Sequence, residues 1–256
     1  MIDGHPSLPY YVSATSDARV QLWQYGQSAS SYKYHSSLHG RVSQIKFDTF
    51  GSHFALTQAH GDLNLWKFAN HAREDPDIVL NCHSKSTYDL EFLNSSSIFA
   101  TTGYSSDGRA IKVWDTLMKS KKGFQFDARD TDIREISYNS YSQIICGGGR
   151  KGELYFYDIR HKRRIKSISA HSGHISALLN IDNLLYSTAA DGFIKVWDLI
   201  TMETVDCFKY DLDKVKHTKN DRQLIHSAPV LEMKCIDGYV YTCGGDGNIR
   251  KIKLFK

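Results

Sequence analysis

With 256 residues, of which 41% are hydrophobic and 23% charged, the chain has the composition of a folded globular protein and is neither disordered nor fibrous. Its formal net charge of +4 is too small to indicate a nucleic-acid partner, and none is expected. No window approaches the roughly 18 uninterrupted apolar residues of a membrane-spanning helix, and the first residues lack the pattern of a signal peptide. These features predict a cytoplasmic protein.

The cysteines are scattered and form no CxxC pair. An odd number of them in apolar, strand-like runs favours reduced thiols over a disulfide framework. They are Cys82, Cys146, Cys207, Cys235 and Cys243.

Six hairpin-like stretches recur along the chain. Each has two alternating apolar runs joined by a turn, and the second run ends at an anchor residue, usually aromatic. The anchors recur every 40 to 55 residues, mostly near the roughly 40 to 45 residues of a four-stranded propeller blade. The sequence therefore predicts an all-β propeller segment over residues 1–256 with six recognisable repeats. The hairpins are expected near 10–26, 53–69, 98–117, 143–160, 184–200 and 239–255, with anchors Trp23, Trp66, Trp114, Tyr157, Trp197 and Ile252.

Both ends of the repeat array depart from a complete propeller. About nine residues precede the first hairpin, too few for an inner strand and an additional outer strand, and the last repeat ends after its third strand. Because an unpaired strand edge favours aggregation, we expect the chain to be part of a longer or closed seven-bladed propeller. The longest interval contains the polar, non-periodic segment 209–229, which predicts an inserted loop that is either a binding element or disordered.

The repeats resemble those of the WD40 family, most clearly in the IKVWD sequences of residues 111–115 and 194–198. This resemblance implies that a His, a Ser or Thr, the turn Asp and the Trp form a buried hydrogen-bonded set. The second and fourth repeats depart from the pattern, and we expect them to depend on apolar packing. The matching residues are His171, Ser187, Asp191 and Trp197 in the fifth repeat and His83, Thr101, Asp107 and Trp114 in the third.

Longer stretches resemble the carboxy-terminal propeller of the DmX-like proteins, also called rabconnectin-3 alpha, which are related to a subunit of the RAVE complex. The stretches are residues 5–23, 82–117, 147–165 and 243–254. The resemblance implies a non-catalytic scaffold for assembly and regulation of the vacuolar-type proton ATPase, and hence for organelle acidification. It also implies two kinds of protein partner, peripheral-sector ATPase subunits and a second WD40 scaffold subunit, and a location peripheral to endomembranes or vesicles.

No motif predicts catalysis, a metal site or a cofactor. His171 and His174 have a spacing compatible with zinc, but no Cys or carboxylate partner lies near them in the sequence. The GGGR of residues 147–150 opens a hairpin, and no Lys-Ser/Thr pair follows it, so turn geometry explains its glycines better than a phosphate site. We expect no enzyme activity and no cofactor.

Two basic clusters follow the third strands of the third and fourth repeats. Because such turns share one rim of a propeller, we expect both clusters on the same face. They are either solvated turns or a docking patch for an acidic partner surface or anionic lipid. The YDIR of residues 157–160 also resembles the WDxR box of WD40 substrate receptors of cullin ubiquitin ligases, which is the alternative function. The cluster residues are Lys119, Lys121 and Lys122, and Arg160, Lys162, Arg163 and Arg164.

Overall fold

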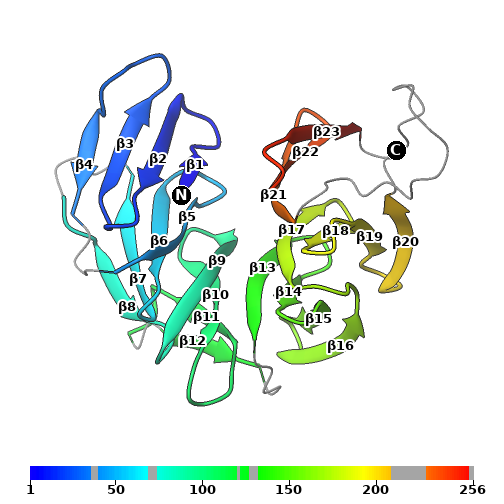
Figure 1. Cartoon of the computed structure of the whole chain (residues 1–256). Helices are drawn as coiled ribbons and strands as arrows, with labels where there is room; N and C mark the ends of the chain where they lie inside the picture. The colour runs from blue at the N-terminus through cyan, green and yellow to red at the C-terminus, as the bar shows by residue number, and fades with distance from the viewer. Residues whose placement is uncertain (36–39, 69–73, 120–121, 127–131, 209–228, 254–256) are drawn as a thin grey trace, which may run out of the picture. The chain divides into compact units, whose positions relative to one another are not determined.

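The computed structural model describes residues 1–35, 40–68, 74–119, 122–126, 132–208 and 229–253. In these ranges every regular element is a β-strand, and the strands form six antiparallel sheets in chain order (Figure 1), which confirms the predicted all-β fold. We call the sheets blades 1 to 6. The chain divides into two compact units, Met1–Ile136 and Ser137–Lys256, which are described separately.

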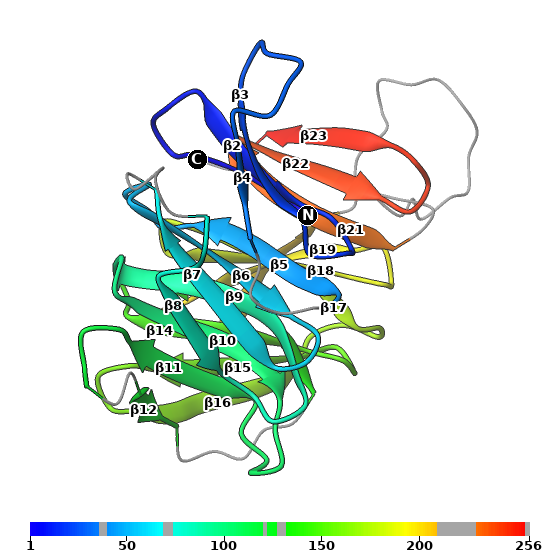
Figure 2. The same ribbon diagram turned by 90° about the vertical axis from the view of Figure 1, so that its left-hand side faces the viewer.

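The first unit holds blades 1 to 3, each a four-stranded meander (Figure 2). The nine residues before the first hairpin contain the short strand β1, which pairs with β2. Blade 1 is β1 (Ile2–Gly4), β2 (Tyr10–Ala14), β3 (Val20–Gln24) and β4 (Tyr32–Tyr34); blade 2 is β5 (Val42–Phe47), β6 (His53–Gln58), β7 (Asp62–Lys67) and β8 (Ile78–Asn81); blade 3 is β9 (Ser86–Ser95), β10 (Ile98–Tyr104), β11 (Ile111–Asp115) and β12 (Lys122–Gln125).

The second unit holds the remaining blades, and the division between units falls inside the first strand of blade 4. Blade 6 has three strands in the described part of the chain. Blade 4 is β13 (Ile133–Asn139), β14 (Ile144–Gly149), β15 (Glu153–Asp158) and β16 (Arg163–Ser169); blade 5 is β17 (Ile175–Ile181), β18 (Leu184–Ala189), β19 (Ile194–Asp198) and β20 (Glu203–Phe208); blade 6 is β21 (Val230–Ile236), β22 (Tyr239–Gly244) and β23 (Ile249–Lys253).

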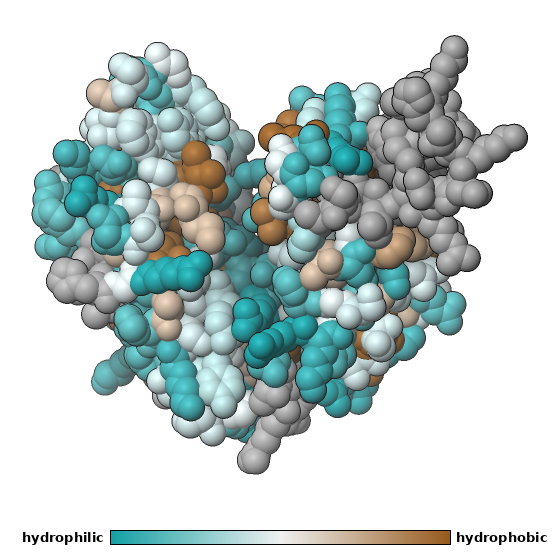
Figure 3. Space-filling view, in the orientation of Figure 1, coloured by the Kyte–Doolittle hydropathy of each residue, from teal (hydrophilic) through white to brown (hydrophobic). Residues whose placement is uncertain are grey.

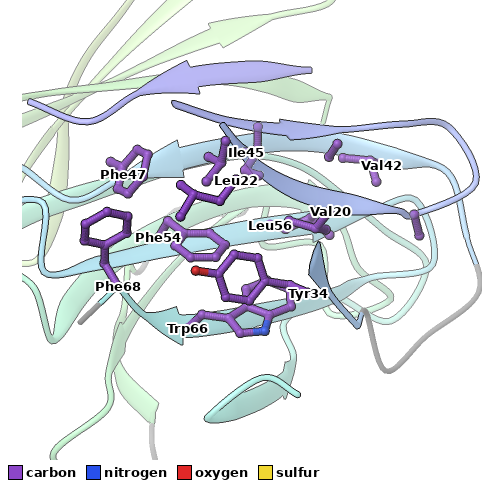
Figure 4. Packing of buried hydrophobic residues seen from close by; sticks show 13 residues of the cluster. Val20, Leu22, Tyr34, Val42, Ile45, Phe47, Phe54, Leu56, Trp66 and Phe68 are labelled. Carbon is purple, nitrogen blue, oxygen red and sulfur yellow. The ribbon is translucent and has the colours of Figure 1, made fainter. Parts of the chain in front are cut away.

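The hydrophobic core lies between the faces of neighbouring blades. In the first unit, Trp66 of blade 2 belongs to one buried cluster with Val12 and Leu22 of blade 1 (Figure 4). In the second unit, Trp197 of blade 5 is buried in the same way with Phe156 of blade 4. The alternation of apolar residues in each strand thus supplies both faces of a blade, so the core is a series of similar interfaces.

Polar contacts also join the first strands of neighbouring blades in the first unit. Asp3 on β1 accepts a hydrogen bond from the backbone N–H of Phe47 on β5 at 2.8 Å. Lys46 on β5 pairs with Glu91 at 2.9 Å and with Asp89 at 3.2 Å, both on β9. Buried or half-buried charges are tolerated when they are paired in this way, so these contacts fix the register between the first strands.

One of the three buried hydroxyls in the first unit that have no hydrogen-bond partner among the described residues is on β4. It belongs to Tyr34, whose ring lies beside Phe54 and Trp66 (Figure 4). A buried polar group without a partner retains its desolvation cost, whereas its ring still packs. We expect Tyr34→Phe to leave the free energy of unfolding unchanged or to raise it by up to about 1 kcal/mol, measured by urea denaturation. A loss above that amount would show that the hydroxyl has a stabilising contact.

Candidate functional site

The buried histidine of blade 5 joins three elements. His171 lies before β17, and its Nε2 is 2.8 Å from Ser187 Oγ on β18. Its Nδ1 is 3.0 Å from Asp191 Oδ2 in the turn between β18 and β19. Trp197 on β19 donates its indole N–H to the same Ser187 oxygen at 2.8 Å. A neutral His171 satisfies the whole set: Ser187 donates to Nε2, and Nδ1–H donates to Asp191.

Backbone geometry brings the histidines into these sets. Gly152, in the turn between β14 and β15, has φ +87°, and its carbonyl accepts the N–H groups of Ala170 and His171. A Cβ at Gly152 would lie 2.2 Å from the His171 carbonyl oxygen, so only glycine fits there. Gly61, in the turn between β6 and β7, has φ +98°, and a Cβ at this position would clash with the carbonyl oxygen of His83. The turn of one blade therefore positions the histidine of the next.

The set in blade 5 closes its turn and stabilises a neutral imidazole. Asp191 also accepts hydrogen bonds from the backbone N–H groups of Ser172 at 3.0 Å and Phe193 at 3.1 Å. Burial lowers the pKa of His171, although the neighbouring Asp191 carboxylate opposes this shift. The four residues named from the repeat pattern therefore form a hydrogen-bonded scaffold for the turn.

The corresponding set in blade 3 differs from the expected one in a single member. His83 Nε2 is 3.0 Å from Thr101 Oγ1, which accepts the Trp114 indole N–H at 2.9 Å. Its Nδ1, however, is 3.0 Å from Ser105 Oγ, while the expected Asp107 pairs with Lys112 at 3.1 Å. The expectation that Asp107 bonds His83 is therefore wrong.

The length of the turn explains why Ser105, and not Asp107, is the hydrogen-bond partner of His83. Eight residues separate Thr102 from its partner Ile111 in blade 3, whereas five separate Thr188 from Ile194 in blade 5. The longer turn carries Asp107 away from the imidazole. Because the site is buried and Lys112 is near, the pKa of His83 is lowered to about 3, and the imidazole is neutral at physiological pH.

Blade 1 bonds its indole group to a second-strand hydroxyl as blades 3 and 5 do, whereas blade 2 uses a backbone carbonyl. Trp23 donates to Ser13 Oγ at 2.8 Å, and Trp66 donates to the backbone carbonyl of Glu74 at 3.2 Å. The anchors of blades 2 and 4, Trp66 and Tyr157, are both fully buried. Apolar packing is thus available to the two repeats that lack the complete motif.

The structure describes only part of the first basic cluster. Lys119 is exposed in the turn after β11, and Lys122 begins β12, but its side chain is not described. Lys121 lies outside the described residues. The clusters belong to different units, so their expected position on one shared face stays a prediction.

The second basic cluster is placed clearly. Arg160, in the turn between β15 and β16, donates two side-chain hydrogen bonds to Asp158, from Nε at 3.2 Å and from a terminal nitrogen at 3.0 Å. These bonds lower the pKa of Asp158. Lys162, Arg163 and Arg164 follow it and are all exposed. The cluster therefore offers three exposed cations beside an arginine that Asp158 already orients.

Sequence reasoning missed the role of the aspartate that follows the anchor. Asp158 accepts the N–H groups of Arg160 at 2.8 Å and His161 at 3.3 Å, and Asp198 accepts that of Ile200 at 2.6 Å. Asp115 accepts the N–H of Leu117 at 3.0 Å in blade 3. The signal was present in the repeated IKVWD, because a strand-ending Asp can accept backbone N–H groups two residues ahead.

In the second unit, these turns and the turns between first and second strands form one surface, which we call the unit 2 rim (residues 140–143, 159–162, 182–183 and 199–202). The N–H of Ile159 donates to the Gln143 carbonyl at 3.1 Å, and Leu199 donates to Asn183 at 2.9 Å. Lys166 joins blade 4 to the Met202 carbonyl of blade 5 at 3.0 Å. The rim is therefore a hydrogen-bonded platform rather than a set of separate loops.

The unit 2 rim displays apolar tips that the sequence pattern did not reveal. Tyr141 and Ile200 are 79% and 73% exposed. Each follows a residue whose side chain accepts turn N–H groups: Asn139 accepts from Tyr141 at 3.0 Å, and Asp198 accepts from Ile200. Aromatic and arginine side chains on a rigid surface are typical of protein interfaces. The rim is the best candidate interaction site in this unit.

Three other expectations concern metal sites, membrane-spanning helices and the inserted loop. Among the residues that the structure describes, no group of three or more His, Cys, Asp or Glu side chains is arranged to hold a metal ion. The same described ranges contain no helix long and apolar enough to cross a membrane. Of the predicted inserted loop 209–229, residues 209–228 lie outside the described part of the chain, so its role stays a prediction.

Comparison with known proteins identifies the repeats. The family model for the WD domain, G-beta repeat (WD40), matches residues 75–115 and 162–198. The computationally designed Ika8 protein has a solved structure with a TM-score of 0.72 and 21% sequence identity, covering 96% of this chain and 68% of that one. At this identity the likeness shows the β-propeller fold alone.

Several kinds of relative match in sequence, and two of them bear on function. DmX-like protein 1 from Mus musculus and from Homo sapiens is 27% identical over 259 residues, covering 96% of this chain. The chain spans 8% of the length of these relatives. A DDB1- and CUL4-associated factor 11 homologue from Caenorhabditis elegans is 30% identical over 111 residues, covering 39% of this chain and 19% of the relative. The chain thus carries WD40 repeats in a β-propeller fold and resembles DmX-like protein 1.

Proposed function

We propose that the chain is a non-catalytic interaction module of a scaffold that serves assembly and regulation of the vacuolar-type proton ATPase at endomembranes. The observation that carries the proposal is the resemblance to DmX-like protein 1 across 96% of the chain. WD40 propellers are generally protein-interaction modules, and specificity in such folds lies in the loops and turns. The expected partners are peripheral-sector ATPase subunits and a second WD40 scaffold subunit.

The unit 2 rim supplies a physical basis for partner binding. Its turns are fixed by hydrogen bonds, so Tyr141 and Ile200 are presented without a large ordering cost on binding. Lys162, Arg163 and Arg164 lie beside the Asp158-oriented Arg160 and would meet an acidic partner surface. A rigid apolar and cationic surface of this kind fits a protein partner with exposed carboxylates.

The test is affinity purification of the native protein with and without Arg163→Glu and Arg164→Glu, followed by mass spectrometry. Wild type should recover peripheral-sector ATPase subunits, and the double variant should reduce their recovery at least about tenfold, because reversed charges repel an acidic partner. A matched control is Arg150→Glu with Lys151→Glu: these exposed cations lie in the turn at the other end of β15. The control should retain the partners.

Three results would contradict the proposal. One is the absence of ATPase subunits together with recovery of cullin-ligase adaptors that Arg160→Ala abolishes. That result would favour the ubiquitin-ligase receptor, which the 30% identity to a DDB1- and CUL4-associated factor supports over part of the chain. The second is equal loss of ATPase subunits in the double variant and its control. The third is retention of the subunits by both the double variant and its control, which would show that the subunits bind elsewhere than at the basic cluster.

A further inference from the structure

Turns from all three blades of the first unit form a hydrogen-bonded surface, which we call the unit 1 rim (residues 5–9, 48–52, 95–97 and 116–119). The His5 Nε2–H donates to the Gly51 carbonyl at 3.0 Å and joins blade 1 to blade 2. The hydroxyls of Ser52 and Ser96 lie 2.8 Å apart and join blade 2 to blade 3. Within blade 3, the Thr116 N–H donates to the turn between β9 and β10 at 2.9 Å. The first unit therefore forms this surface by itself.

Large apolar side chains project from the unit 1 rim. Phe50 is 65% exposed and Leu117 is 83% exposed, and Leu8 and Met118 are exposed as well. In blades 2 and 3, the described turns at the other end of the strands have one such side chain, Tyr104, at 39%. The exposed apolar residues of these blades are therefore concentrated at one end of the strands, which is typical of a surface that binds an apolar partner or a membrane.

The backbone beneath these side chains is already ordered. The Leu8 N–H donates to His5 Nδ1 at 3.0 Å, on the same imidazole that contacts blade 2. The Leu117 N–H donates to the Asp115 carboxylate at 3.0 Å. Because the turns are held in this way, little conformational entropy is lost when the apolar side chains enter another surface.

The charge of the unit 1 rim is positive. Lys119 is exposed directly after the two apolar residues of blade 3, and Lys122 begins β12 three residues later. Asp48 is the one acidic residue within the four ranges of the rim, and it is buried. The acidic stretch before β8 belongs to the outer edge of blade 2, where Glu74 pairs with His35 at 3.1 Å. Lysine beside apolar side chains attracts anionic headgroups, and its aliphatic stem can lie along the apolar region.

The composition of this rim fits a lipid surface better than a protein surface. Protein interfaces are enriched in arginine and depleted in lysine and serine. The four ranges contain no arginine, and the Ser95–Ser97 turn separates Phe50 from Leu117. In the view of Figure 3, the hydrophobic surface of the first unit is likewise divided into small areas. A fluid interface adapts to separate apolar side chains, whereas a protein partner needs a matching pocket for each of them.

We propose that the unit 1 rim inserts Phe50, Leu117 and Met118 into the interfacial region of an anionic lipid bilayer. Lys119 lies among the headgroups and supplies the preference for anionic lipid. Closure of a longer propeller leaves this surface accessible, because closure covers the faces of blades and not their turns. The inference goes beyond the proposed function, which concerns protein partners at the unit 2 rim.

The test is flotation of the purified full chain with vesicles of phosphatidylcholine alone or mixed in equal amounts with phosphatidylserine. The mixed vesicles should bind the chain at least about fivefold better. Phe50→Ser combined with Leu117→Ser should weaken binding to them at least about tenfold, because two large apolar side chains no longer leave water. Lys119→Glu should weaken it at least about fivefold, since a carboxylate replaces a cation at an anionic surface. The vesicles contain no protein, so the result is independent of ATPase binding.

Matched controls come from the other end of the strands in the same unit. Tyr104 and Lys85 are exposed there, with the Lys85 ammonium 4.9 Å from the centroid of the Tyr104 ring. Tyr104→Ser and Lys85→Glu should bind vesicles like wild type, and circular dichroism verifies the fold of every variant. Insertion is measured with Phe50→Trp, which brominated phosphatidylcholine in the mixed vesicles should quench beyond the level of the wild type. Tyr104→Trp should show no additional quenching.

Three results would overturn the proposal. One is the absence of flotation with the mixed vesicles. The second is equal quenching of Phe50→Trp and Tyr104→Trp, which would mean that the rim does not enter the bilayer. The third is flotation that the rim variants leave unchanged. Loss of co-purifying proteins from a membrane-free extract in the Phe50→Ser, Leu117→Ser variant, without any flotation of wild type, would assign the rim to a protein partner instead.

Discussion

Acidification should destabilise this protein through His83, with a loss of roughly 4 kcal/mol in the free energy of unfolding by about pH 3. The imidazole is buried between Thr101 and Ser105, and its pKa is lowered to about 3. Below about pH 6.5 the unfolded chain binds a proton at this residue that the folded chain does not bind. The contribution of His83 to the free energy of unfolding is therefore fully present above that pH. It falls by about 1.4 kcal/mol per pH unit as the pH decreases towards the folded-state pKa.

The measurement is urea denaturation at pH 7, 6, 5 and 4, followed by tryptophan fluorescence. His83→Gln cannot take up this proton. The slope of its free energy of unfolding against pH should therefore be smaller than that of the wild type by the equivalent of about one proton. The control is His174→Gln, which replaces an exposed histidine of the second unit and should retain the slope of the wild type. Identical slopes for wild type and His83→Gln would show that His83 is protonated in the folded state.

Asp191→Ala should lower the free energy of unfolding by about 1 to 3 kcal/mol. The substitution removes the acceptor for His171 Nδ1 and for the N–H groups of Ser172 and Phe193. Because His171 is buried, water replaces that acceptor poorly, and a buried donor remains without a partner. Chemical denaturation measures the loss, and any binding of the proposed partners at the unit 2 rim should be unchanged because the turn lies at the other end of the strands.

The matched control is Asp107→Ala in blade 3. Asp107 has the same place in the repeat pattern, but it bonds the Arg109 N–H and the Lys112 ammonium instead of the histidine. Its carboxylate is partly exposed, so the loss should stay below about 1 kcal/mol. Equal losses for Asp107→Ala and Asp191→Ala would mean that the histidine contact contributes little to stability.

The strands were predictable because side chains alternate along them. The expected hairpin near 53–69 contains β6 (His53–Gln58) and β7 (Asp62–Lys67), and that near 184–200 contains β18 (Leu184–Ala189) and β19 (Ile194–Asp198). A hairpin with a short turn also fixes which residues face each other, whereas the relation of Ser187, Asp191 and Trp197 came from the resemblance to WD40 repeats. The repeat period and the alternation were sufficient for this part of the fold.

The failures occurred where the turns vary. Three additional residues in the turn of blade 3 place Ser105, instead of Asp107, beside His83, and no periodicity signals this change. The exposure of Tyr141 and Ile200 could not be predicted either. Both residues lie in turns, and the alternation of apolar and polar residues assigns side chains to a buried or exposed face only within strands. The unpaired Tyr34 hydroxyl depends on three-dimensional packing that the alternation does not specify.

The strand-ending aspartates bear on how the residues displayed in their turns can change over time. Asp115, Asp158 and Asp198 hold the backbones of three turns through main-chain N–H groups, so the shape of each turn does not depend on the side chains in it. The residues displayed there already differ, with Leu117 in one turn, Arg160 in another and Ile200 in the third. New side chains can therefore be introduced at these positions with little effect on folding. The module can acquire a different partner by a few substitutions while its architecture is retained.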